Sequence, residues 1–123
     1  MRLSRREFVR LVRQSFAELP PRVVEHLNNV DILVQDWPDP EDLVQTDADS
    51  PSNLLGLYTG VPLTEREGGP PALPDRITLF QRPIEAACAS KEQMTEEIRK
   101  TLLHEVGHYL GIDEEALERL GYA

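Results

Sequence analysis

Hydrophobic residues recur at helical spacing in two stretches of the chain. Near the start, Ser4 and Glu7 form a capping-box pattern, and the apolar stripe that follows is Phe8, Leu11, Val12, Phe16 and Leu19. Near the end, Ser90 and Gln93 form a second capping box, followed by the stripe Met94, Ile98, Leu102, Val106 and Tyr109. We therefore predict a first helix that ends at Pro20-Pro21 and a longer helix that stops at Gly111.

Three stretches between these helices favour strands because they are short, apolar and rich in β-branched residues. They are residues 30–37, 54–61 and 75–81, and Gly56 in the second predicts a bulge or a close backbone approach. The intervening residues 36–53 carry six acids and no base among prolines and serines, which predicts a loop. Short helices are expected from Pro21 and over residues 114–121, and a short turn at residues 86–87.

The length and composition favour one soluble globular domain over residues 1–123. A chain of 123 residues is long enough to bury a single core, and 40% of its residues are apolar. No apolar run approaches the roughly 18 residues of a membrane span, and the arginine-rich start lacks the apolar centre of a signal peptide. We expect a cytoplasmic protein. The single cysteine, Cys88, excludes an internal disulfide and a cysteine-type zinc site.

The net charge of −9 disfavours nucleic acids and anionic membranes as partners, because binding to either depends on Lys and Arg. The first 13 residues nevertheless carry five arginines against one glutamate. This basic start is either a docking arm for an acidic partner or the solvated face of a helix that packs on its own domain. The apolar stripe in the same segment favours the second interpretation.

The segment HEVGHYLGIDEE, residues 104–115, carries the candidate chemistry. On a helix, His104 and His108 point only about 40° apart, so both imidazoles can grip one metal ion. They lie away from the apolar stripe, so they are not simply part of the core. Glu105 adds a carboxylate that can take a proton from a zinc-bound water as that water attacks a carbonyl group. Hydrolytic zinc helices place a glutamate directly after the first histidine for this reason.

A catalytic zinc site normally has three protein ligands, so a third is expected after the two histidines. Gly111 can end the helix in a left-handed conformation and turn the chain back toward the metal. Glu114, six residues after His108, is then the candidate third ligand, with Asp113, Glu115 and Glu118 as alternatives. In the alternative interpretation, Asp113 caps the last helix while Glu114 and Glu115 favour its dipole from the first turn. We expect Zn²⁺, although His and carboxylate ligands suit other divalent first-row ions.

The segment HEVGHYLGIDEE resembles the active site of the zincin metallopeptidases, and HExxHxxG followed by an acid is similar to a metzincin-type site whose third histidine is replaced. Together with LPDRITLFQRPIE, it resembles the small bacterial zincin-like family called minimal zincins. The resemblance implies an α+β fold in which a small mixed sheet packs on the active-site helix beside N-terminal helices. It implies that residues 75–81 form the edge strand that binds an extended peptide. It also implies His104 and His108 as zinc ligands and Glu105 as general base.

Two hypotheses follow for the function. The first is a zinc-dependent peptidase acting on a peptide or protein substrate. The second is a catalytically inactive metal-binding or interaction domain on a zincin fold. Both methionines precede the motif, so the metzincin Met-turn is absent, and only residues 109–123 follow His108 to build the cleft wall. Neither the substrate nor the oligomeric state follows from the sequence.

Overall fold

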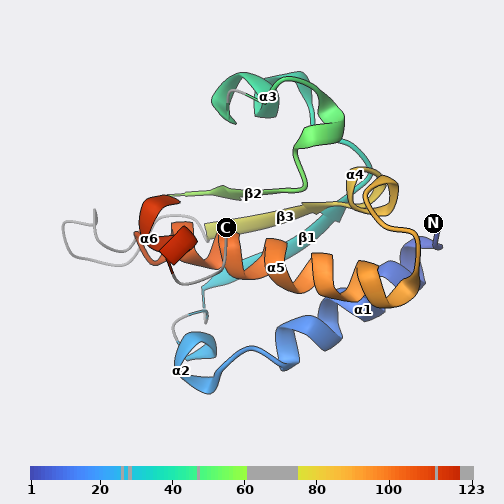
Figure 1. Ribbon diagram of the computed structural model, residues 1–123. Helices are drawn as coiled ribbons and strands as arrows, with labels where there is room; N and C mark the ends of the chain where they lie inside the picture. The colour runs from blue at the N-terminus through green and yellow to red at the C-terminus, as the bar shows by residue number, and fades with distance from the viewer. Residues whose placement is uncertain (26, 28, 47, 61–74, 113, 120–123) are drawn as a thin grey trace.

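The structure is a computed structural model that describes residues 1–25, 27, 29–46, 48–60, 75–112 and 114–119. The described elements combine helices with a small sheet in an α+β arrangement (Figure 1). In chain order they are α1 (Arg5–Ala17), α2 (Pro21–Val24), β1 (Val30–Gln35), α3 (Pro40–Thr46), the 3-10 helix η1 (Pro51–Asn53), β2 (Gly56–Thr59), β3 (Asp75–Phe80), α4 (Gln81–Ala86), α5 (Lys91–Tyr109) and α6 (Glu114–Arg119).

The sheet has the strand order β1-β3-β2. It is mixed, as predicted, because β1 runs parallel to β3 while β2 runs antiparallel to it. The prediction that residues 75–81 form an edge strand is wrong: β3 is the central strand, and β1 and β2 are the edges among the described residues. Burial explains the central position, because Ile77 and Leu79 on one face of β3 and Thr78 and Phe80 on the other are all buried.

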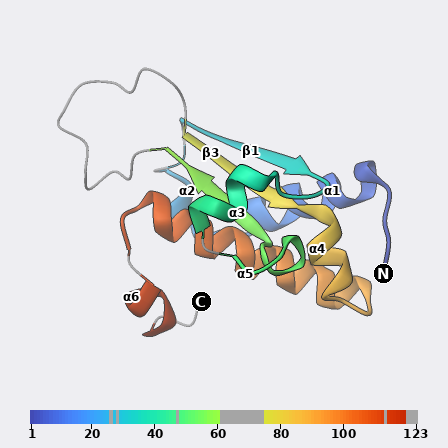
Figure 2. The same cartoon turned by 90° about the horizontal axis from the view of Figure 1, so that it is seen from above.

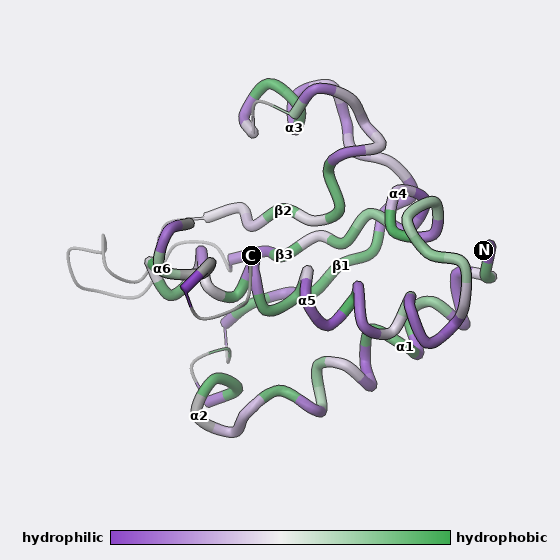
Figure 3. Tube along the Cα trace, viewed as in Figure 1, coloured by the Kyte–Doolittle hydropathy of each residue, from purple (hydrophilic) through white to green (hydrophobic). Residues whose placement is uncertain are grey.

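The core lies between the sheet and the two long helices. Figure 1 shows α1 and α5 along one side of the sheet and α3 on the opposite side, and the view from above in Figure 2 agrees. Both long helices alternate hydrophilic and hydrophobic residues along their length, as amphipathic helices do (Figure 3). Their predicted stripes are confirmed as core residues, with Phe16 partly buried; the largest fully buried side chains include Phe8, Ile77, Leu79, Met94, Ile98 and Leu102.

Both predicted capping boxes begin helices where expected. The Ser4 hydroxyl accepts a hydrogen bond from the Glu7 N–H, and the Ser90 hydroxyl accepts one from the Gln93 N–H, each at 3.1 Å. The basic helix α1 packs against α5. Its Arg5 side chain also forms an ion pair with the carboxylate of Asp36, which follows β1, at 2.6 Å. The interpretation of the arginine-rich start as the outer face of a packed helix is thus confirmed. No described helix is long and apolar enough to cross a membrane.

Two segments differ from the prediction because proline is compatible with the first turn of a helix. Residues 40–46 of the expected loop form α3, in which Pro40 is the first residue and the Asp39 N–H donates to the Asp42 carboxylate at 2.8 Å. This bond is half of a capping box. The expected turn at residues 86–87 is the end of α4, with Pro83 in its first turn. The prolines that predicted loops therefore sit where a helix has no need of their missing N–H.

A buried polar cluster joins the N-terminal segment to α4. The Glu85 carboxylate accepts hydrogen bonds from the Leu3 N–H at 2.6 Å and from Arg82 at 2.7 Å. Gln81, itself fully buried, donates to the same carboxylate at 3.2 Å. Burial raises the pKa of Glu85, but these hydrogen bonds and the Arg82 charge together lower it more. The pKa of Glu85 is therefore below its ordinary value, and its ionised form stabilises the fold.

We predict that Glu85→Gln lowers the free energy of unfolding by about 1–3 kcal/mol at pH 7. Because folding lowers the pKa of Glu85, its contribution is complete above the unfolded value of about 4.3 and is lost as the pH falls through the folded value. The difference between wild type and variant should therefore shrink below about pH 4. Urea denaturation at pH 7, 5 and 3.5 measures this difference. Glu41→Gln, at an exposed acid of α3, is the control, and a pH-independent difference for Glu85→Gln would contradict the assignment.

Candidate metal centre

The two histidines of the HExxH segment converge at the C-terminal end of α5. His104 Nε2 and His108 Nε2 lie 3.0 Å apart, and the ring centroids are separated by 4.7 Å. Both residues are partly buried, while the residues of the apolar stripe on the same helix are fully buried. The prediction that helical spacing brings these two imidazoles together, away from the core stripe, is confirmed.

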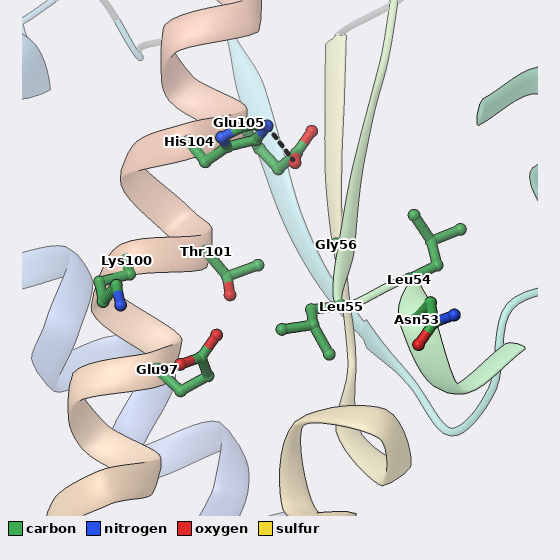
Figure 4. A pocket seen from close by; sticks show the side chains of 9 residues that line it. All are labelled: Asn53, Leu54, Leu55, Gly56, Glu97, Lys100, Thr101, His104 and Glu105. Carbon is green, nitrogen blue, oxygen red and sulfur yellow. Dashed lines mark ion pairs between the residues drawn. The ribbon is translucent and has the colours of Figure 1, made fainter. Parts of the chain in front are cut away.

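Glu105 extends from α5 toward the edge strand β2. Its Oε1 accepts a hydrogen bond from the Tyr58 N–H at 2.9 Å, and its Oε2 lies 3.9 Å from His104 Nε2 (Figure 4). The residue is only 7% exposed, so the carboxylate is held in one orientation by a backbone donor rather than by solvent. One oxygen is thus fixed to the sheet and the other faces the histidines.

His104, Glu105 and His108 together form a group that could hold a metal ion. Each offers one ligand atom, and these atoms lie within 4.8 Å of one another. Zinc accepts imidazole nitrogen and carboxylate oxygen at about 2.0–2.2 Å, so nitrogens as close as those of His104 and His108 can share one ion. The donor set therefore fits a divalent first-row metal.

The turn after α5 has the predicted form. Gly111 has a φ of 82°, in the left-handed region, and its N–H donates to the His108 carbonyl. The Ile112 N–H donates to the Gly107 carbonyl, which completes a Schellman motif. The helix therefore ends with the buried Tyr109, and the chain turns directly beyond the second histidine.

The candidate third ligands all follow this turn. Glu114 is the first residue of α6, but its side chain, that of Glu118 and the whole of Asp113 lie outside the described residues. Glu115 is described: its side chain is 80% exposed and contacts Arg119 at 3.3 Å within the same helix. The Glu115 side chain therefore forms a local ion pair at the surface and is not directed to the histidines.

A cleft with a volume of about 270 Å³ adjoins the histidines on their N-terminal side along α5. One wall is α5 and the other is the strand β2 with the residues before it (Figure 4). The lining residues are Asn53, Leu54, Leu55, Gly56, Glu97, Lys100, Thr101, His104 and Glu105. The edge strand that borders the site is therefore β2, and not residues 75–81 as predicted.

Gly56 sets the distance between β2 and α5. A Cβ atom at this position would lie 2.7 Å from Thr101 Cγ2 and 3.3 Å from Glu105 Cγ. Since real Cβ atoms do not approach carbon so closely, a side chain here would push the strand away from the helix. The predicted close backbone approach at Gly56 is confirmed, and it brings the Tyr58 N–H within reach of Glu105.

An aromatic pair closes the gap between β2 and the end of α5. The rings of Tyr58 and Tyr109 make an edge-to-face contact with centroids 5.8 Å apart. The Tyr58 hydroxyl donates to the Asp75 carboxylate at 3.0 Å, and Tyr109 is only 3% exposed. Both tyrosines therefore serve in packing.

Cys88 is also buried, and its burial together with the charge of Glu97 raises the pKa of its thiol.

We predict that Gly56→Ala lowers the free energy of unfolding by about 1–3 kcal/mol through overpacking against Thr101. Thr101→Ser removes the Cγ2 atom that the new methyl group would meet. The double variant should therefore be more stable than the sum of the two single effects implies. Urea denaturation of all four proteins gives the coupling energy. Strict additivity would show that the two positions do not meet as described.

Comparisons with known proteins agree with this geometry. The family model described as zincin-like metallopeptidase matches residues 27–122. Among solved structures, a conserved hypothetical protein from Thermo thermophilus is similar, with a TM-score of 0.60 and 24% sequence identity over 88% of this chain and 94% of that one. At that identity the likeness shows the fold alone. No curated protein matches this sequence.

Proposed function

Because the chain belongs to the zincin-like metallopeptidase family, we propose that it is a zinc-dependent peptidase that cleaves a peptide bond with water. The single observation that best supports this proposal is the position of Glu105. Glu105 is a buried carboxylate whose ligand atom lies within 4.8 Å of those of both histidines. Here one oxygen is anchored on the Tyr58 N–H and the other faces His104.

In this proposal His104 and His108 hold the metal and Glu114 is the third protein ligand. The two imidazole nitrogens are 3.0 Å apart, and the Schellman turn at Gly111 redirects the chain immediately after His108. Glu114 starts the next helix two residues after Ile112. We favour it over Glu115 because the Glu115 carboxylate contacts Arg119 at the exposed surface.

Glu105 is the proposed general base. When bound, zinc supplies Lewis acidity, which polarises a substrate carbonyl and lowers the pKa of water toward about 7. The Oε2 atom of Glu105 accepts the proton of the attacking water, and the carboxyl group then delivers this proton to the leaving amine. The bond from the Tyr58 N–H to Oε1 keeps Oε2 in place through both transfers.

The edge of β2 that faces away from β3 is the proposed contact for the substrate backbone. The Tyr58 N–H points to Glu105, away from β3, so the backbone groups of Gly56, two residues earlier, point the same way. An extended peptide can add to such an edge by main-chain hydrogen bonds. This arrangement would carry the scissile carbonyl along the cleft past His104.

We predict that His104→Ala and His108→Ala each abolish stoichiometric zinc binding, because each removes one of three protein ligands. Glu114→Gln should likewise lower the zinc content well below one ion per chain, because it replaces the third protein ligand, and Glu115→Gln, the neighbouring control, should leave it unchanged. Elemental analysis after dialysis against a zinc buffer measures the content, with about one ion per wild-type chain expected. Full zinc retention by Glu114→Gln would exclude that residue as a ligand.

We predict that Glu105→Gln retains zinc and folds normally but loses at least about 100-fold in hydrolysis. Glutamine keeps an oxygen that can accept the Tyr58 N–H bond while it removes the proton acceptor. Mass spectrometry of a random peptide library incubated with each zinc-loaded protein measures cleavage. If wild type and variant are equally inert although both bind zinc, the protein is instead a non-catalytic metal-binding or interaction domain on this fold.

A further inference from the structure

The cleft beside the histidines contains a carboxylate that the proposed chemistry does not use. Glu97 lies seven residues before His104 on α5, which places it about 10 Å away along the helix axis and within about 20° of the same face. Its side chain is partly buried and lines the cleft, and Figure 4 shows the carboxylate turned along α5 toward Thr101. Glu97 is thus aligned with the metal centre along one wall.

The negative charge of Glu97 is not matched within the described part of the chain. Among those residues its carboxylate has neither a hydrogen bond nor an ion pair. Lys100 also lines the cleft, but it is exposed, lies on the outer side of α5 in Figure 4, and helps to lower the pKa of Glu96 instead. The charge of Glu97 acts on the protein interior, because it raises the pKa of the buried Cys88 thiol.

The remaining lining of this part of the cleft suits the stem of a long side chain. Leu54 and Leu55 contribute apolar surface to the strand side of the cleft. Thr101 is 8% exposed and packs its methyl group toward Gly56. A cleft that combines the apolar side chains of Leu54 and Leu55 with a partly buried carboxylate matches a lysine or arginine, whose aliphatic stem lies on apolar surface while its charge meets an acid.

The direction of β2 shows which part of a substrate would reach Glu97. Gly56 lies beside Thr101 and Tyr58 beside Glu105, so β2 and α5 advance in the same direction. A peptide that pairs antiparallel with β2 runs the opposite way, from the histidines toward Glu97. Residues that follow the cleaved bond therefore enter the cleft. At about 3.3 Å per residue, a long side chain from the first or second of them spans the distance to Glu97.

We propose that Glu97 makes this site selective for peptides that carry Lys or Arg as the first or second residue after the cleaved bond. The inference rests on the proposed peptidase function for the direction of the substrate. Glu97 is a specificity-determining residue in this proposal. Removal of its charge should change neither zinc binding nor the position of the general base Glu105.

The test uses three fluorescein-labelled pools of random decapeptides, which carry Lys, Gln or Glu at every third position and uncharged residues elsewhere. Binding to zinc-loaded Glu105→Gln protein is measured by fluorescence anisotropy, and cleavage by zinc-loaded wild type is mapped by mass spectrometry. We expect the Lys pool to bind about tenfold more tightly than the Glu pool, as for a hydrogen bond to a charged group. Cleavage should place Lys on the C-terminal side of the broken bond.

Glu97→Gln should reduce the preference for the Lys pool by about tenfold in both measurements. Glu96→Gln is the matched control, because it changes the net charge equally but lies one position away at an exposed ion pair with Arg99. It should leave the preference within about twofold, as expected for exposed surface charges. An equal loss in both variants would show a general effect of net charge and overturn the inference.

The outcomes separate this inference from the proposed function. Hydrolysis by the wild type without a preference for Lys would overturn the role of Glu97 and leave the peptidase function standing. A Glu97-dependent binding preference without hydrolysis would overturn the peptidase function and retain Glu97 as a selector of basic peptides. If none of the three pools is bound or cleaved, both proposals fail.

Discussion

The close packing of β2 on α5 is the constraint on which the rest of the site depends. It requires the absence of a side chain at position 56, because a Cβ atom there would meet Thr101 and Glu105. At this separation Glu105 can hydrogen-bond to the backbone of the strand while it remains beside His104. The same contact creates the cleft, since the strand and the helix are its two walls. The orientation of the Glu105 carboxylate and the cleft beside it thus both depend on a single packing interaction.

Much of this arrangement could be predicted from the sequence because it is encoded by local patterns. Helix periodicity located α1 and α5 and identified the stripes that fill the core. Capping residues and Gly111 placed the ends of α5, and the four-residue spacing brought the imidazoles together. Each of these features depends on residues a few positions apart, for which helix geometry is fixed.

The features that could not be predicted depend on residues far apart in the chain. The order β1-β3-β2 is decided by which strands bury both faces, and the alternation within residues 75–81 does not reveal it. The hydrogen bond between Tyr58 and Glu105 joins residues 47 positions apart. Its donor is a backbone N–H, which nearly every residue type has, so the identity of residue 58 does not indicate the bond. Residues 40–46 were missed for a different reason: Asp39-Pro40 with Asp42 is a helix start, but the density of acids and prolines favoured a loop.

The backbone origin of the donor to Glu105 has a consequence for how the sequence can vary. A side-chain donor would be lost by almost any substitution, whereas the N–H at position 58 is present in every residue except proline. The identity of residue 58 is therefore free to follow the demands of packing against Tyr109 and Asp75. Substitutions along this strand can then change the side chains that border the cleft while the orientation of the carboxylate stays the same.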